Sequence, residues 1–177
     1  MSQNKALRIQ FLLLLLISLS FAQNGNKIEV FSVKNLSDDN TVFEEYKGKI
    51  TIINFWATWC AACLKEMPQL EKIYNEFKRD QVEVIGVAVM SDSNKIEKMI
   101  EVTGVTYPIL TGDRKLLQKI SNSLIIPQTI ILNKEGKIVA RFFGDQSYKT
   151  YRETILHYLE QSQLTGAPRT SLNYSQE

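Results

Sequence analysis

The sequence predicts an α/β fold in which a central mixed β-sheet carries helices on both faces. The chain has 177 residues, 44% of them hydrophobic, which suits one globular domain. Short runs rich in β-branched and aromatic residues alternate with amphipathic segments, and such β-α-β crossovers build parallel strands. The last two strand-like runs are joined by a turn that contains Gly136, which predicts a hairpin and therefore an antiparallel edge.

The first half of the chain contains the clearest strand and the clearest helix. Residues 27–33 are expected to form a short strand, and residues 35–40 form a polar turn. Residues 49–56 (KITIINFW) are β-branched and aromatic, which predicts a buried strand. Apolar residues at helical spacing predict a long amphipathic helix over 60–79, and Pro68 is expected to kink it.

The second half continues the alternation. Residues 81–89 form a continuous apolar run, typical of a strand buried on both faces. A helix over 93–102 follows a polar cluster that can cap it. The remaining expected elements are a strand at 107–110, a helix at 114–120, strands at 128–133 and 137–143, and a closing helix at 148–160.

The N-terminus has the pattern of a secretory signal peptide. Lys5 and Arg8 precede an apolar run, which ends in the small residues Ser20 and Ala22. The run has about half of the ~20 residues that span a bilayer, so cleavage after Ala22 is favoured over a retained anchor. We therefore expect an exported protein, periplasmic or extracellular. It is not expected to be a lipoprotein, because no cysteine stands at the cleavage site.

These observations divide the chain into a signal peptide at 1–22, one domain at 23–161 and a polar tail at 162–177 that is expected to be flexible. The net charge is +2, from 21 basic and 19 acidic residues. Lys5 and Arg8 account for that excess, so the mature chain is formally neutral. A neutral chain lacks the electrostatic footprint of a nucleic-acid-binding protein.

Cys60 and Cys63 are the only cysteines of the chain, and they lie where a buried strand gives way to a helix. A helix N-terminus offers unpaired N–H groups and a positive dipole end, which favour a thiolate at Cys60. Cys63, one turn later, can form a disulfide with it, so the pair is a candidate two-electron couple for thiol–disulfide exchange. A zinc half-site is disfavoured because no further cysteine is available as a ligand. A purely structural disulfide is disfavoured because the loop that it would close is so small that it would add little stability. We therefore expect neither a metal nor a cofactor besides this disulfide.

The motif around the cysteines resembles a known family. INFWAT followed by WCAAC, with Glu66-x-Pro68 behind it, is similar to the thioredoxin superfamily, and within it to the TlpA/ResA-like extracytoplasmic thiol–disulfide oxidoreductases. The segment Ile126-Pro127-Gln128-Thr129 also matches, and the resemblance covers about residues 28–159. It implies a thioredoxin-like fold with catalytic Cys60 and Cys63.

The resemblance also implies supporting residues. It implies a cis peptide bond at Pro127 beside the cysteine pair, where the Ile126 backbone would pair with a substrate peptide. An ordinary trans proline is the alternative. Trp59 is expected at the rim of the site, as part of the docking surface.

Glu66 is a candidate proton carrier. It lies one helical turn after Cys63, and the matching glutamate of ResA-like proteins sits at the active site. The alternative is a solvated helix carboxylate. Asn54 stands where thioredoxins carry an aspartate, and an amide cannot shuttle a proton. The Ala61-Ala62 pair brings no charge to stabilise a Cys60 thiolate, which favours a reducing couple.

The resulting hypothesis is an exported reductase of protein disulfides, for example in apocytochrome c, that takes electrons from a membrane dithiol donor and acts as a monomer. An oxidase or isomerase using the same pair is the main alternative. A thiol peroxidase is disfavoured because Ala57 stands where a Thr or Ser would be needed. A binding module with a permanent disulfide is the last alternative. His157 is expected to be a partly exposed helical residue without a catalytic role.

Overall fold

A computed structural model describes residues 32–35, 40–42, 46, 48–77 and 81–166. The predicted signal peptide, the first part of the strand expected at 27–33, and residues 167–177 of the expected tail lie outside the described residues.

The described residues form a seven-stranded mixed sheet with the order β2-β1-β5-β4-β3-β6-β7. Strands β3, β4 and β5 are parallel to one another, whereas β6 and β7 form an antiparallel hairpin on β3, and β1 and β2 form an antiparallel pair on β5. The strands are β1 (Ser32–Asn35), β2 (Asn40–Val42), β3 (Ile50–Trp56), β4 (Val82–Val89), β5 (Ile109–Gly112), β6 (Gln128–Leu132) and β7 (Ile138–Phe143).

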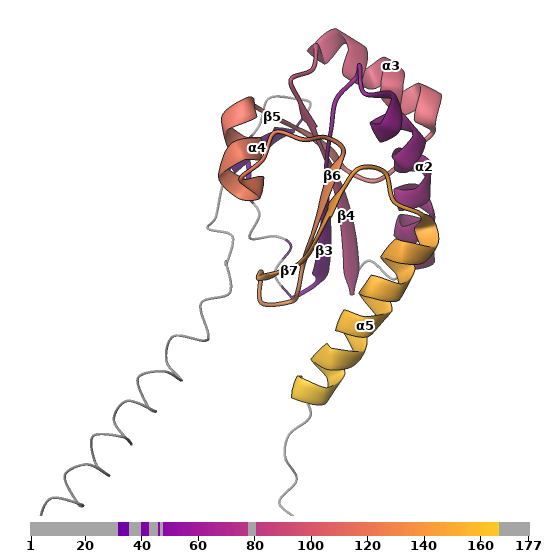
Figure 1. The fold of residues 1–177 in the computed structure, drawn as a ribbon, viewed down its shortest axis with the longest axis vertical. Coiled ribbons are helices and arrows are strands. Elements are labelled where there is room, and N and C mark those ends of the chain that lie inside the picture. Colours follow the sequence, from indigo (N-terminus) through magenta and orange to yellow (C-terminus); the bar gives the residue numbers. More distant parts are fainter. Residues whose placement is uncertain (1–31, 36–39, 43–45, 47, 78–80, 167–177) are drawn as a thin grey trace, which may run out of the picture.

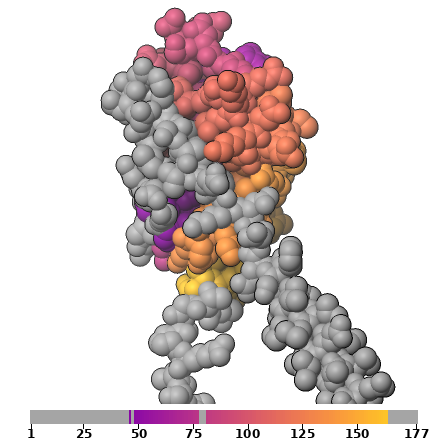
Figure 2. All heavy atoms as spheres, turned by 90° about the vertical axis from the view of Figure 1, so that its left-hand side faces the viewer, coloured from indigo at the N-terminus to yellow at the C-terminus, as the bar shows by residue number. Residues whose placement is uncertain are grey.

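Helices cover both faces of this sheet. The described helices are α2 (Ala61–Glu76), α3 (Ser93–Thr103), α4 (Arg114–Ser121) and α5 (Tyr148–Gly166). Helices α2 and α5 pack together on one face, with α3 beside α2, and α4 lies on the opposite face (Figure 1). Seen from that opposite side, α4 forms part of the outer surface (Figure 2). The predicted mixed sheet between two helical layers is confirmed.

The protein has a hydrophobic core on each face of the sheet, and strand β3 contributes side chains to both. All seven of its residues are buried, so both of its faces are covered. Its side chains alternate: Ile52 and Trp56 belong to the core under α2 and α5, whereas Ile53 and Phe55 belong to the core under α4. Asn54 falls on the α2 side by the same alternation, so a polar residue faces the main core.

Several boundaries differ from the predictions. The turn expected at 35–40 is wrong at both ends, because Asn35 closes β1 and Asn40 opens β2. Strand β5 begins two residues later than expected, since its pairing with β4 starts at Ile109. Helix α2 continues through Pro68 and ends at Glu76, before the expected end at 79.

Helix α5 runs to Gly166 rather than stopping at residue 160, and it thus enters the segment expected to be a tail. Its last turns extend past the sheet (Figure 1), so they need no apolar face and give no apolar period in the sequence. None of the helices in the described part of the chain is both long enough and apolar enough to span a bilayer.

Candidate active site

Cys60 is the N-cap of α2 and lies just beyond the end of β3. Its extended backbone turns the chain from strand to helix, and its N–H donates to the Ala57 carbonyl over 3.1 Å. Its Sγ accepts the N–H of Cys63 over 3.2 Å and is joined to Cys63 by a disulfide. Cys60 is 8% exposed and Cys63 is fully buried, so Cys60 is the sulfur that a partner can reach first.

Cys60 lies at the positive end of the α2 helix dipole. The first turn of α2 carries no acidic residue, and Ala61 and Ala62 are exposed and uncharged. The positive end of the helix dipole is therefore not neutralised by a side chain of that turn. Once the disulfide is reduced, this environment favours the Cys60 thiolate.

The peptide bond between Ile126 and Pro127 is cis, as the resemblance implied, and the alternative of a trans proline is wrong. Pro127 is buried, and it directly precedes β6, in which Gln128 pairs with Phe55 of β3. Pro127 therefore lies at the end of the sheet where β3 delivers Cys60. The Pro127 carbonyl accepts the Gly144 N–H over 2.9 Å, and Ile126 packs against the core cluster that contains both cysteines.

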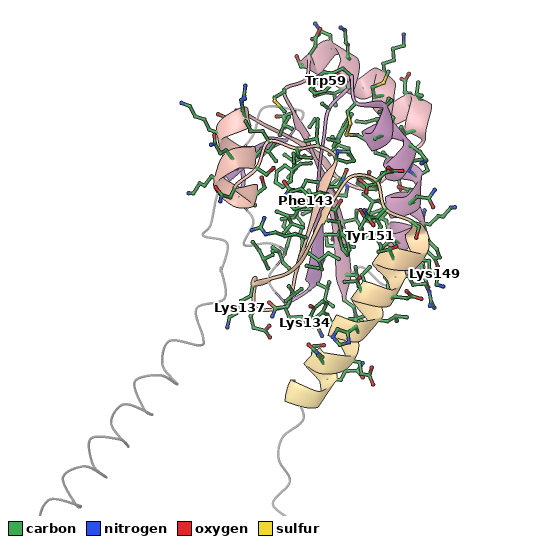
Figure 3. All side chains as sticks on the ribbon, in the orientation of Figure 1. Trp59, Lys134, Lys137, Phe143, Lys149 and Tyr151 are labelled. Carbon is green, nitrogen blue, oxygen red and sulfur yellow. A yellow bond between two sulfur atoms is a disulfide. The ribbon has the colours of Figure 1, made fainter. Side chains whose placement is uncertain are left out.

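Exposed apolar side chains lie at this end of the molecule. Trp59 is 65% exposed, and its Nε1 donates to the Met90 carbonyl over 2.9 Å, which fixes the ring at the surface (Figure 3). Ile125 and Phe143 are exposed as well, and Phe143 pairs with Gln128 across the hairpin. Neither Ile125 nor Phe143 was predicted from the sequence as a site residue. The position of Phe143 as the last residue of an expected strand could have indicated it.

Glu66 is buried in spite of its charge. It is 1% exposed, so the alternative of a solvated helix carboxylate is wrong. Its Oε1 accepts the backbone N–H of Gln146 over 2.9 Å and the hydroxyl of Tyr151 over 2.5 Å. Its Oε2 accepts Nδ2 of Asn54 over 2.8 Å. Three donors from three separate segments thus hold the carboxyl group.

Tyr151 and Thr129 extend this network, and neither was predicted from the sequence. The Tyr151 hydroxyl lies 2.9 Å from Oγ1 of Thr129, which also accepts Nδ2 of Asn54 over 2.9 Å. All four side chains are at most 1% exposed. Tyr151 reaches them from α5 (Figure 3), which lies against α2.

Burial raises the pKa of Glu66 above its ordinary value. The hydrogen bonds from Tyr151, Gln146 and Asn54 oppose this shift, and the nearby negative charge of Asp145 adds to it. Burial, followed by the charge of Glu66, also raises the pKa of Tyr151, so that its hydroxyl stays protonated. The site therefore contains a carboxyl group that holds a proton more readily than an exposed glutamate does, next to a hydroxyl that keeps its proton.

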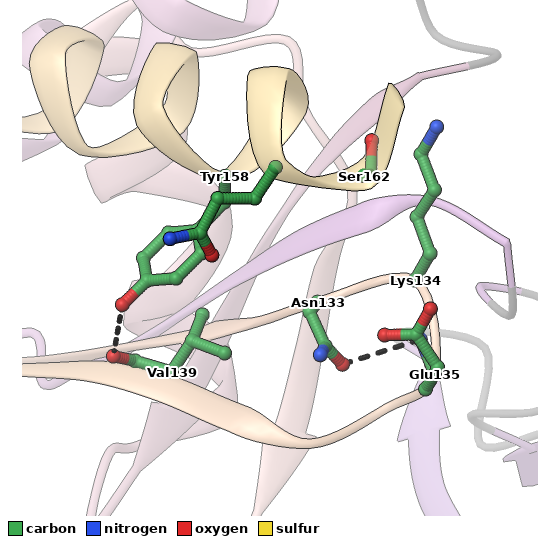
Figure 4. A pocket seen from close by; sticks show the side chains of 7 residues that line it. Asn133, Lys134, Glu135, Val139, Tyr158 and Ser162 are labelled. Atoms are coloured by element: carbon green, nitrogen blue, oxygen red, sulfur yellow. Dashed lines mark hydrogen bonds between the residues drawn. The ribbon is translucent and has the colours of Figure 1, made fainter. Parts of the chain in front are cut away.

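Other features lie apart from this site. Among the described residues, no group of three or more His, Cys, Asp or Glu side chains could hold a metal ion. His157 is exposed on α5, as expected. A pocket of about 250 Å³ lies between the β6–β7 turn and α5 (Figure 4). Its lining includes Asn133, Lys134 and Tyr158, and none of the predicted site residues.

The fold and the disulfide at the start of α2 define a thioredoxin-like protein with a redox-active Cys60–Cys63 pair. Residues 24–141 match the AhpC/TSA family, and the chain belongs to it. The chain is similar to the thioredoxin-like protein YneN of Bacillus subtilis, with 34% identity over 75% of this chain and 79% of that protein. It is also similar to the thiol-disulfide oxidoreductase ResA of Halalkalibacterium halodurans, with 28% identity over 76% of each chain.

The fold is likewise that of a solved structure, a thiol:disulfide interchange protein of the thioredoxin family from Chlorobium tepidum. The TM-score is 0.69 at 20% identity, over 77% of this chain and 97% of that one. The protein is thus a thiol–disulfide oxidoreductase of thioredoxin-like fold.

Proposed function

We propose that the protein is an exported reductase of disulfides in secreted proteins, such as those between the haem-attachment cysteines of apocytochrome c. The observation that carries this proposal is the asymmetry of the pair: Cys60 caps α2 and is 8% exposed, whereas Cys63 is fully buried. One sulfur is thus available for attack on a partner, and the other is kept for the second step.

The reaction uses the two cysteines in turn. The Cys60 thiolate attacks one sulfur of the substrate disulfide, forms a mixed disulfide, and releases the other substrate sulfur as a thiolate that takes up a proton. Cys63 then gives its proton to Glu66 and attacks Cys60 Sγ. This second attack forms the Cys60–Cys63 disulfide and releases the reduced substrate. Two electrons have passed to the substrate, and a membrane dithiol donor restores the pair.

Substrate docking is assigned to the residues around Cys60. The Ile126 backbone before cis Pro127 would pair with an extended substrate segment, and exposed Trp59 would contact its side chains. Glu66 supports the second step as a proton acceptor, because it lies one turn from Cys63 on the same helix and is buried like it.

The environment of Cys60 supports a reducing direction of electron flow. Ala61 and Ala62 add no charge to the helix dipole, so the thiolate is stabilised only moderately and the couple is reducing. An oxidase or isomerase would use the same pair in reverse. The third residue before Cys60 is Ala57, which offers no hydroxyl, and this disfavours a thiol peroxidase.

Export is inferred from residues 1–22, whose basic start and short apolar run are typical of a signal peptide. We infer a monomer that acts outside the cytosol and binds neither a metal nor a nucleic acid.

Trapping tests the proposal. The Cys63→Ser variant should hold its substrate as a mixed disulfide on Cys60, and Cys60→Ser is the matched control that captures nothing. The captured partner is identified by mass spectrometry, and the oxidation state of the wild-type pair is measured in cells. A mostly reduced pair and a captured disulfide protein are expected. A mostly oxidised pair would indicate the oxidase instead.

A further inference from the structure

Tyr151 joins the C-terminal helix to the carboxyl group beneath the active-site helix. Its hydroxyl lies 2.5 Å from Glu66 Oε1 and 2.9 Å from Thr129 Oγ1. A phenol has one proton, so it donates to only one of these oxygens at a time. Its hydrogen therefore points either to Glu66 or to Thr129, and Tyr151 is the donor in both contacts.

Two arrangements of protons satisfy this geometry. When Glu66 is ionised, Tyr151 donates to it. When Glu66 carries a proton on Oε1, it donates to Tyr151, and Tyr151 donates to Thr129. The heavy atoms keep their positions in both arrangements, because each hydroxyl hydrogen only rotates about its C–O bond.

We propose that Tyr151 and Thr129 are positioning residues of the reaction: the hydroxyl hydrogen of Tyr151 turns from Glu66 to Thr129 each time Glu66 gains a proton, and turns back when Glu66 loses it. This inference rests on the proposed role of Glu66 as the acceptor of the Cys63 proton. This switch of the Tyr151 hydrogen lets the buried carboxyl group of Glu66 change its charge while its contact with Tyr151 persists. Neither water nor the side chains then need to move.

The remaining contacts of Glu66 do not provide this reversal. The Gln146 backbone N–H is a fixed donor. Asn54 Nδ2 also donates to Oε2, so a proton on Oε2 would face another donor unless the amide turned over. The hydroxyl of Tyr151 is thus the one contact of Glu66 among the described residues that can switch between donating and accepting in place. Several titratable groups surround Glu66. They are Tyr151 from α5, Tyr107 before β5, Asp145 after β7 with its partner Lys65, and Cys63 on α2.

The two hydroxyls act in opposite directions on the pKa of Glu66. Tyr151→Phe removes a donor to the carboxylate, so the pKa of Glu66 should rise by about one pH unit. Thr129→Val leaves the Tyr151 proton without an acceptor when Glu66 is protonated, so the pKa of Glu66 should fall by a similar amount. A role confined to packing would not produce shifts of opposite sign.

The test is a carbon-13 NMR titration of the Glu66 carboxyl in the oxidised full chain, in which the cysteines do not titrate. Tyr148→Phe is the matched control, because the Tyr148 hydroxyl also donates to a glutamate, Glu76, over 2.5 Å, but at the surface. It should leave the titration of Glu66 unchanged, and Thr129→Ser should restore the wild-type value. Shifts of the same sign, or no shift, in the Tyr151 and Thr129 variants would overturn the proposal. If Tyr151→Phe does not fold, the test rests on the two Thr129 variants: the pKa of Glu66 should fall in Thr129→Val and keep its wild-type value in Thr129→Ser.

A second measurement separates this inference from the proposed function. The rate at which Cys63 displaces thionitrobenzoate from Cys60 is followed against pH in the same variants. Its midpoint should move with the pKa of Glu66, upward for Tyr151→Phe and downward for Thr129→Val. If the pKa of Glu66 shifts in the variants but the pH midpoint of the displacement rate does not, Glu66 is not the proton acceptor. The proposed switch of the Tyr151 hydrogen would still be supported by the NMR titration.

Discussion

Asn54 and Glu66 are joined inside the protein, with Nδ2 of the amide donating to Oε2 of the carboxyl over 2.8 Å. Asn54 stands at the strand position where thioredoxins carry an aspartate. The amide cannot carry a proton, but it supplies a donor to the buried carboxyl group that lies opposite it. Its own Oδ1 is buried and has no hydrogen-bond partner within the described part of the chain. The substitution of amide for acid thus matches the presence of Glu66 on the facing helix.

Asn54→Asp should destabilise the protein at neutral pH. The variant places a second carboxyl against Glu66, and like charges in a buried site oppose ionisation of both. We expect a loss of about 3 kcal/mol in the free energy of unfolding at pH 7, smaller at pH 5, where one group stays protonated. Urea denaturation at the two pH values measures this. Asn75→Asp is the control, because Asn75 Nδ2 donates to Glu71 over 2.9 Å at the surface. An equal loss at both pH values would contradict the interpretation.

Glu66→Gln should change how stability depends on pH. Since burial raises the pKa of Glu66 in the folded protein, the neutral form is the stabilising one. Its contribution is complete below the ordinary value of 4.5 and is lost as pH rises through the folded pKa. The loss amounts to about 1.4 kcal/mol for each pH unit that separates the folded pKa from the unfolded one. The variant lacks this loss, so its stability relative to wild type should increase from pH 4 to pH 8.

Glu76→Gln serves as the control of opposite sign. Hydrogen bonds from Tyr148 and Arg152 lower the pKa of Glu76, so its contribution is present above 4.5 and is lost as pH falls. The two difference curves, obtained by chemical denaturation, should therefore slope in opposite directions. Parallel slopes would show that burial of Glu66 does not govern its titration.

Alkylation of the reduced protein should be selective. Cys60 is the partly accessible N-cap, whereas Cys63 is fully buried. With one equivalent of iodoacetamide at pH 7, we expect modification at Cys60 and protection of Cys63 until the protein is unfolded. Peptide mapping by mass spectrometry gives the two occupancies. Equal modification of both would contradict the assigned order of attack.

Trp59→Ala should weaken the docking of protein substrates more than the chemistry. The ring is 65% exposed and makes one hydrogen bond, to the Met90 carbonyl, so its removal should change stability by less than about 1 kcal/mol. We expect KM for a protein disulfide to rise several-fold while turnover of a small aromatic disulfide is retained. Leu156→Ala, an exposed apolar residue on α5, is the control. An unchanged KM in Trp59→Ala would remove Trp59 from the docking surface.

Gln128→Met should stabilise the protein. Gln128 is fully buried, and neither its Oε1 nor its Nε2 has a hydrogen-bond partner among the residues that the structure describes. An apolar side chain of similar length removes that cost, so we expect a gain of about 1–2 kcal/mol in the free energy of unfolding. Thermal denaturation of this variant beside Gln118→Met, at an exposed position of α4, measures the difference. A loss of stability would show that the amide has a role in the fold.

Local patterns in the sequence were sufficient to predict part of the fold. Apolar runs and helical spacing located β3, α2 and β4 to within a few residues, because periodicity reports which faces are buried. The Cys-x-x-Cys motif at a strand–helix junction placed the disulfide, since three residues in a helix bring the two sulfurs within one turn. The resemblance around Pro127 supplied the cis bond. Edges such as β2 and the end of α5 were misjudged, because they bury little and leave a weak pattern.

The surroundings of Glu66 could not be predicted from local patterns, because they depend on how the whole domain packs. Its position in α2 was compatible with either solvent or the core, and packing of α5 against α2 placed it in the core. Its partners Asn54, Gln146 and Tyr151 lie 12, 80 and 85 residues away in the chain, so no local spacing relates them. The charge and hydrogen bonding of a buried side chain depend on which segments pack around it, and the folding of the whole domain determines this packing.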